Sequence, residues 1–353
     1  MLLHVITSML TGGAERLVTE LLPRFTAAGL DCGLAVFDAT PTPFLERMQD
    51  AGIKVCPLGY GRTSVYNPAQ IGRLRELFRQ ARTVHTHNTT PQFFGAAAWR
   101  KGGPKMVTTE HNTDNRRRHI PMSGHLDRMM YSRYDAIACC SKPVMDALRK
   151  HLGTIPGRQQ LVTIENGIDL TPYLAIPDKK PGETVEILMV SAFRPQKDHL
   201  TALRALAMLP DRFRLTLAGD GELRGQVSCE TGRLGLTGRV TFTGNVADVP
   251  ALYRDADIAL LCTHHEGMSL SIIEAMASGR PLVASDVEGV RENVGDGAIL
   301  VPGADPGALA DAILALDSSD ELRARTGMQG RRQARRFDID TTAQKYITLY
   351  KSI

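Results

Sequence analysis

The order of apolar and polar positions along the chain predicts short buried strands that alternate with amphipathic helices. An apolar run stands at residues 2–8, and Leu17, Leu21 and Phe25 then recur at the spacing of one helical face. Further strand-like runs stand at residues 32–37, 54–58, 82–87, 105–110 and 135–140. Because parallel strands are joined through crossover helices, this alternation predicts a parallel sheet with helices on both faces.

The alternation stops at residues 170–183, which carry three prolines and no regular period, so this segment is interpreted as a linker. It resumes with apolar runs at residues 185–192, 214–219, 240–244, 257–262 and 281–285. We therefore expect an α/β protein of two Rossmann-like domains, residues 1–176 and residues 177–337. The stretch 338–353 predicts an amphipathic helix that packs on its own domain or crosses back to the first.

Composition narrows the class of protein without deciding its function. The 353 residues are 43% hydrophobic and carry a formal net charge of +4, which suits a globular enzyme and not a strongly basic nucleic-acid-binding protein. No apolar run approaches the ~20 residues of a membrane-spanning helix. The six cysteines form no Cys-x-x-Cys pair, which indicates free thiols in a reducing compartment. A cytoplasmic protein is expected, with contact to the inner face of the membrane left open.

The stretch HHEGMSLSIIEAMASGRPLV, residues 264–283, carries the most specific chemistry. Glu266 and Glu274 stand eight residues apart around a loop and an expected helix start at Leu270. The amides of loop 267–269 can face an anion or a sugar, and a carboxylate accepts hydrogen bonds from neighbouring hydroxyl groups. From spacing alone, a capping acid followed by a solvated helix acid explains the two glutamates about equally well.

Two cations follow the first strand expected in the second domain. Arg194 and Lys197 stand three residues apart in SAFRPQKD, just before an expected helix. Cations beside a helix N-terminus can stabilise the charge on a departing nucleoside diphosphate. A solvated surface pair is the alternative.

Glycines and histidines mark the expected strand ends of the first domain. Gly12 and Gly13 allow a ligand to approach the backbone closely, although such glycines often serve only the geometry of a turn. His111 directly follows a strand and could hydrogen-bond to a sugar, with a structural role as the alternative. His85 and His87 suggest a metal, but no third ligand is evident, so a loop-lining role is preferred.

These motifs resemble those of the retaining family-four glycosyltransferases (glycosyl transferases group 1), and the resemblance covers nearly the whole chain. Glu266 and Glu274 are similar to the family's Glu-x7-Glu motif, in which the first glutamate and the following amides contact the transferred sugar and the second binds the ribose hydroxyls. Arg194 and Lys197 resemble the pair that grips the donor phosphates. The resemblance implies the GT-B fold, in which two Rossmann-like domains face each other across a cleft.

Other loops resemble the family in part. Gly12 and Gly13, with Glu15, resemble an acceptor-side Gly-Gly-x-Glu loop, and residues 166–169 resemble an Asn-Gly-Ile-Asp motif. Residues 288–292 resemble a Gly-Gly-x-x-Glu loop, in which Glu292 is expected to reach the sugar or a structural partner.

The chain also departs from the family's pattern. Phe193, Asp198 and Glu288 stand where the family has glycine, and Met268 and Ser269 stand where it often has Phe or Leu followed by Gly or Pro. These departures leave the identity of the donor sugar open.

The resemblance implies a set of site residues. The expected catalytic residues are Glu266, His111, Arg194 and Lys197. The expected donor-binding residues are Glu274, Gly12, Gly13, Gly267, Met268, Ser269, Leu270, Asn166, Gly219 and Gly289. No metal and no cofactor is expected, because the nucleotide-sugar is a substrate. Asp255 and Asp257 match a metal-binding Asp-x-Asp pattern, but they precede a strand and so lie away from the expected site.

The implied activity is that of a metal-independent, retaining hexosyltransferase in polysaccharide or glycoconjugate biosynthesis. The second domain would bind a nucleotide-sugar donor, with a UDP-sugar expected, and the first would bind a glycan or polyprenyl-linked acceptor. The basic run 116–118 would contact an acceptor pyrophosphate or anionic lipid, or form solvated surface. A nucleotide-sugar epimerase and a non-catalytic nucleotide- or sugar-binding protein are the alternatives.

Overall fold

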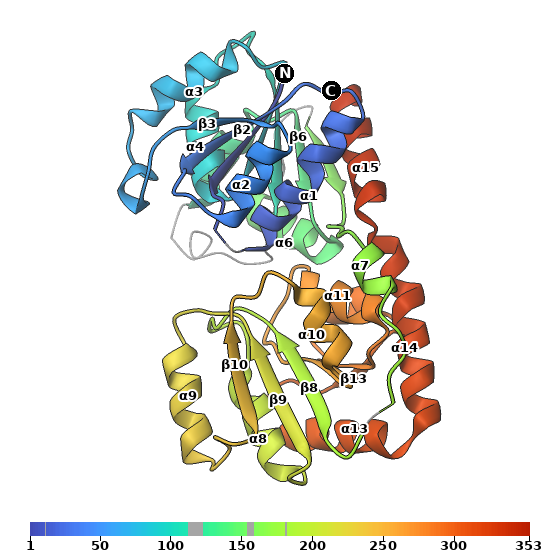
Figure 1. The fold of residues 1–353 in the computed structure, drawn as a ribbon. Coiled ribbons are helices and arrows are strands. Elements are labelled where there is room, and N and C mark those ends of the chain that lie inside the picture. Colours follow the sequence, from blue (N-terminus) through green and yellow to red (C-terminus); the bar gives the residue numbers. More distant parts are fainter. Residues whose placement is uncertain (11, 112–122, 154–158, 181) are drawn as a thin grey trace. The chain divides into compact units, whose positions relative to one another are not determined.

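The computed structural model describes residues 1–10, 12–111, 123–153, 159–180 and 182–353, which fall into two compact units (Figure 1). The first unit comprises Met1–Gly167 and Ile339–Ile353, and the second comprises Ile168–Asp338. Each unit is built on one parallel sheet, as the alternation of apolar runs predicts.

The sheet of the first unit has seven strands in the order β3-β2-β1-β4-β5-β6-β7, and every neighbouring pair is parallel. Its strands are β1 (Leu2–Ser8), β2 (Cys32–Asp38), β3 (Lys54–Pro57), β4 (Thr83–His87), β5 (Lys105–Glu110), β6 (Ala136–Cys139) and β7 (Gln160–Thr163). Every residue of β2 is buried, because helices cover both faces of a parallel sheet.

The helices of the first unit are α1 (Gly13–Ala27), α2 (Pro43–Asp50), η1 (Arg62–Ser64), α3 (Gln70–Phe78), α4 (Thr89–Ala98), α5 (Ser123–Tyr131), α6 (Lys142–Leu152) and α15 (Ile339–Ser352). The C-terminal helix α15, red in Figure 1, lies against α1, blue. Its apolar face, which includes Ile339, Ala343 and Tyr346, is buried in the same core as Leu17 and Phe25 of α1.

The sheet of the second unit has six strands in the order β10-β9-β8-β11-β12-β13, again all parallel. Its strands are β8 (Val185–Val190), β9 (Phe213–Ala218), β10 (Val240–Gly244), β11 (Ile258–Leu261), β12 (Leu282–Ser285) and β13 (Ile299–Val301). Its helices are α7 (Thr171–Leu174), α8 (His199–Met208), α9 (Arg224–Arg233), α10 (Val249–Asp255), α11 (Leu270–Ser278), α12 (Val290–Val294), α13 (Pro306–Ser318), α14 (Asp320–Ala334) and η3 (Arg335–Phe337).

Residues 170–183, interpreted from the sequence as a linker, are instead packed in part onto the second unit. Tyr173 and Ile176 are almost fully buried, and the side chain of Arg331 donates a 2.6 Å hydrogen bond to the carbonyl of Ile176. The unit boundary therefore falls after Gly167 and not after residue 176. Pro172 is accommodated in the first turn of α7, and apolar side chains of the segment are buried.

In the part of the chain that the structure describes, no helix combines the length and apolar character needed to cross a membrane.

Candidate functional site

In each sheet, the strand order reverses between two central strands. Ligands of open parallel sheets bind outside the carboxyl ends of the strands at such a point. In the second unit it lies between β8 and β11, and a bridge between Lys197 and Thr263 joins the two loops that leave these strands. Topology alone thus brings the 191–198 and 264–283 motifs to the same place.

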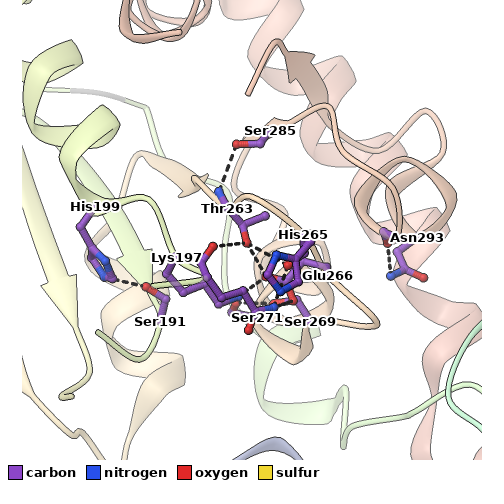
Figure 2. Close-up of polar contacts among 12 residues, drawn as sticks. Ser191, Lys197, His199, Thr263, His265, Glu266, Ser269, Ser271, Ser285 and Asn293 are labelled. Atoms are coloured by element: carbon purple, nitrogen blue, oxygen red, sulfur yellow. Dashed lines mark hydrogen bonds and ion pairs between the residues drawn. The ribbon is translucent and has the colours of Figure 1, made fainter. Parts of the chain in front are cut away.

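Lys197 and Glu266 form an ion pair at this point, and both side chains are largely buried (Figure 2). The hydroxyl of Thr263 donates to Glu266 Oε1 at 2.9 Å, and the amide of Gln196 donates to Glu266 Oε2 at 3.2 Å. A buried carboxylate is costly without such partners. The pair therefore depends on two neighbours, Thr263 and Gln196, that sequence reasoning did not single out.

The loop after Glu266 leads into α11 as expected. Gly267, Met268 and Ser269 are buried, and α11 begins at Leu270. Ser269 is the N-cap residue, but its hydroxyl bonds to Ser271 Oγ at 2.9 Å and caps no backbone amide. The first-turn amides thus keep the positive end of a helix dipole, which favours an anion or a polar ligand atom.

Two of the expected glycines are required by close packing. A Cβ atom at Gly289, whose φ is +84°, would overlap the carbonyl of Glu266, and one at Gly219 would overlap the carbonyl of Ser191. Glu292 accepts a 2.7 Å hydrogen bond from the Gly289 amide, so in this structure it serves as a structural partner at the start of α12.

Two residues that stand where the family has glycine, Phe193 and Asp198, make structural contacts. Phe193 is buried and stacks on the ring of His199, with 4.2 Å between ring centroids. Asp198 is the N-cap of α8 and accepts a 3.0 Å hydrogen bond from the amide of Thr201. The N-terminus of α8 is therefore already capped by a carboxylate, and Arg194 lies exposed on the preceding turn.

Glu274 lies on α11 and is 1% exposed. The hydroxyl of Tyr173 donates to its Oε1 at 2.9 Å. The interpretation of Glu274 as a solvated helix acid is therefore wrong. Tyr173 stands in the segment interpreted as a linker, so the sequence offered no signal for this contact.

Asp257 has a structural partner at the start of β11. Its carboxylate accepts a 2.8 Å hydrogen bond from the amide of Glu186 and pairs with Lys179 at 3.1 Å. These contacts account for the burial of this Asp-x-Asp residue.

In the first unit, the strand order reverses between β1 and β4. Gly12 and Gly13 stand at the start of α1, and the carboxylate of Glu15 folds back over Gly12. Asn88, which follows β4, has a φ of +70° and places its amide 3.5 Å from Glu15 Oε1. A positive φ outside glycine is uncommon and gathers at functional sites.

Histidines occupy the neighbouring strand ends. His111 follows β5, and burial lowers its pKa to about 4, so its imidazole is neutral at pH 7. Both of its ring nitrogens, and Nδ1 of His87, are buried without a hydrogen-bond partner among the residues described here. The rings of His87 and His111 stack at 5.8 Å.

A third buried histidine joins the pair seen in the sequence. One ring nitrogen from each of His4, His85 and His87 lies within 4.8 Å of the others, and His4 Nδ1 is 3.0 Å from His87 Nε2. The two nitrogens of His85 hydrogen-bond to the hydroxyls of Tyr350, 2.6 Å away, and Thr109, 2.7 Å away. Hydrogen bonds therefore occupy both ring nitrogens of His85, whereas Nδ1 of His87 has no partner among the residues described.

Two further predictions concern the end of the first unit and the basic run. Asn166 is buried, at 4% exposure. Arg116, Arg117 and Arg118 lie outside the described residues.

Comparison with known proteins connects these features to one family. The family model described as "Glycosyltransferase Family 4" matches residues 11–172, and the model "Glycosyl transferases group 1" matches residues 176–333. EpsF of Bacillus subtilis is 27% identical over 308 residues, which is 80% of this chain and 78% of EpsF. A phosphatidyl-myo-inositol mannosyltransferase of Mycobacterium leprae is 32% identical over 206 residues, and the match spans about half of each protein, 54%.

Solved structures show the same architecture at low sequence identity. HepE of Anabaena, in complex with UDP and glucose, superimposes with a TM-score of 0.86 at 20% identity, covering 100% of this chain and 99% of HepE. Sucrose-phosphate synthase of Thermosynechococcus elongatus gives a TM-score of 0.80 at 19% identity, covering 99% and 98%. With two parallel Rossmann-like sheets and both halves matched, this chain is a glycosyltransferase of the GT-B fold and belongs to family four, the glycosyl transferases of group 1.

Proposed function

We propose that this glycosyltransferase moves a hexose from a UDP-sugar to a glycan or lipid-linked acceptor, keeps the anomeric configuration and needs no metal ion. The observation that carries the proposal is the arrangement around Lys197 and Glu266, where a buried ion pair stands beside a helix start whose amides no side chain caps, within the residues described. The complex of HepE with UDP and glucose supports a uridine nucleotide as donor.

In the proposed reaction, the diphosphate binds where Lys197 and Arg194 can neutralise its charge. The diphosphate competes with Glu266 for Lys197, which frees the Glu266 carboxylate to accept hydrogen bonds from the hydroxyls of the sugar. The amides at the start of α11 add positive potential at the same place. Fixed cations and amides would supply the stabilisation of the leaving group that a divalent ion supplies in metal-dependent enzymes.

The chemical step exchanges one bond for another. An acceptor hydroxyl attacks the anomeric carbon on the face that the diphosphate leaves, so the configuration is kept. The bond from the anomeric carbon to the diphosphate oxygen breaks, and that oxygen takes the proton of the acceptor hydroxyl. The products are the glycoside and UDP. We propose that the imidazole of His111 forms a hydrogen bond with the sugar. This imidazole is uncharged at pH 7, because burial lowers its pKa to about 4.

The test is a transfer assay with UDP-glucose, UDP-galactose, UDP-N-acetylglucosamine and GDP-mannose, with polyprenyl-linked and free glycan acceptors, in EDTA. Retention is read from the anomeric coupling of the product by NMR. The proposal expects a glycoside of unchanged anomeric configuration with one of the UDP-sugars. Inversion would contradict the mechanism, transfer only from GDP-mannose would contradict the donor assignment, and an altered sugar nucleotide formed without acceptor would indicate an epimerase.

A further inference from the structure

Tyr173 is buried in the short segment that precedes the first strand of the second unit. It lies on α7, a helix of four residues with a proline in its first turn, and it is 1% exposed. Its hydroxyl donates a 2.9 Å hydrogen bond to Oε1 of Glu274, which is itself 1% exposed.

The ring of Tyr173 is fixed by a second tyrosine. Tyr253 of α10 meets it edge to face, with ring centroids 5.9 Å apart and an interplanar angle of 70°. The hydroxyl of Tyr253 donates at 3.0 Å to the carbonyl of Ser271, in the first turn of α11. Two neighbouring tyrosines thus hold the same helix, one through the Glu274 carboxylate and the other through the backbone.

The chain on either side of Tyr173 is anchored as well. Beyond the Arg331 hydrogen bond to Ile176, the side chain of Arg280 donates to the carbonyl of Pro177 at 3.1 Å. The phenol is therefore presented to Glu274 from a fixed backbone, which reduces the entropy lost when the contact forms.

We propose that Tyr173 is a positioning residue that fixes the Glu274 carboxylate to receive the ribose hydroxyls of the donor nucleotide. A carboxylate offers about four lone-pair sites, so Glu274 can accept from the phenol and from two vicinal hydroxyls together. The hydrogen bond from the phenol to Oε1 restricts the rotamers of Glu274, so the phenol sets the rotamer that the ribose meets. This inference rests on the proposed function, because it assumes that Glu274 meets a nucleotide.

The experiment compares two nucleotides on three proteins. Calorimetry measures the dissociation constants of UDP and of 2′,3′-dideoxy-UDP for the wild type, Tyr173→Phe and Tyr253→Phe. The Phe variants each remove one hydroxyl and keep the ring. Without the phenol, the Glu274 carboxylate is no longer held for the ribose, and loss of one of its hydrogen bonds to a ribose hydroxyl costs about tenfold in affinity. We expect Tyr173→Phe to bind UDP about tenfold more weakly and dideoxy-UDP unchanged, whereas Tyr253→Phe keeps the wild-type ratio of the two nucleotides.

Three outcomes would overturn the inference. If Tyr173→Phe keeps the wild-type preference for UDP, Tyr173 does not position Glu274. If it loses affinity for both nucleotides equally, the hydroxyl is merely structural. If the wild type binds neither UDP nor its GDP and ADP counterparts, the proposed function itself fails. If GDP or ADP binds in place of UDP, the same comparison is made with its dideoxy form, because the ribose is common to all three.

Discussion

The reversal points of the two sheets have the same topology and opposite chemistry. In the first unit, β1 and the loop after β5 carry buried imidazoles: burial lowers the pKa of His4 to about 3 and that of His111 to about 4, so both are neutral. In the second unit, Lys197 and Glu266 are buried together as an ion pair. Burial disfavours a single charge. Two opposite charges can be buried together if hydrogen bonds satisfy their remaining donor and acceptor groups. We call the region of His4 and His111 the neutral point, and the region of Lys197 and Glu266 the charged point. Neutral imidazoles suit hydroxyl ligands, and the charged point suits a diphosphate.

The largest effect is expected from the charged point. Lys197→Ala removes the cation proposed to stabilise the departing diphosphate, and loss of one such group costs about 100-fold to 1000-fold in kcat. Steady-state kinetics measure it, with circular dichroism to confirm folding. Lys179→Ala is the matched control, because Lys179 pairs with Asp257 at the start of β11 and has no proposed role in the reaction. Turnover of Lys197→Ala within threefold of the wild type would contradict the assignment.

The neutral point predicts a loss of stability in acid. The unfolded chain protonates His4 near pH 6.5, whereas the folded chain does so only near pH 3, so the unfolded state binds more protons between these values. Stability is therefore lost as the pH falls below 6.5. At pH 5, His4 alone should lower the free energy of unfolding by about 2 kcal/mol.

Urea unfolding of the wild type and of His4→Gln, at pH 7.5 and pH 5.0, measures this contribution. The variant lacks the titrating imidazole, so its free energy of unfolding should fall by about 2 kcal/mol less than that of the wild type between the two pH values. Equal losses in the two proteins would mean that His4 is not held neutral.

A smaller effect is expected at His111. Its substitution by Ala removes one neutral hydrogen bond to the sugar, which corresponds to a loss of about tenfold in kcat/KM. Because the pKa of His111 is about 4, this residue should not titrate near pH 6.5. The pH profile of kcat/KM around pH 6.5 should therefore be the same in the wild type and in His111→Ala. A titration near pH 6.5 that disappears in this variant would show that His111 is solvated and charged in the free enzyme.

The sequence predicted the fold because the relevant signals are local. Apolar runs of five to eight residues marked every strand except β7 and β13, the last strands of the two units, and the helical spacing of Leu17, Leu21 and Phe25 marked α1. The linker interpretation failed at α7, because three prolines suppress a periodic pattern even where Tyr173 is buried.

For the candidate site, the sequence indicated which motifs lie near each other but not their side-chain contacts. Glu266 and Lys197 follow strands that are neighbours in the sheet, so their proximity could be inferred once the strand order was known. The partners Thr263 and Gln196, the third histidine His4, and Tyr173 depend on side-chain packing between segments distant in sequence, for which a single sequence carries no signal.

The most direct test of the charged point is calorimetric titration of the whole protein with UDP, once in EDTA and once in excess Mg²⁺. We predict one equivalent of UDP bound with the same dissociation constant in both buffers, because Lys197, Arg194 and the amides of α11 supply the positive charge. Binding that appears only with Mg²⁺ would contradict the account. A lack of binding in both buffers would contradict it as well.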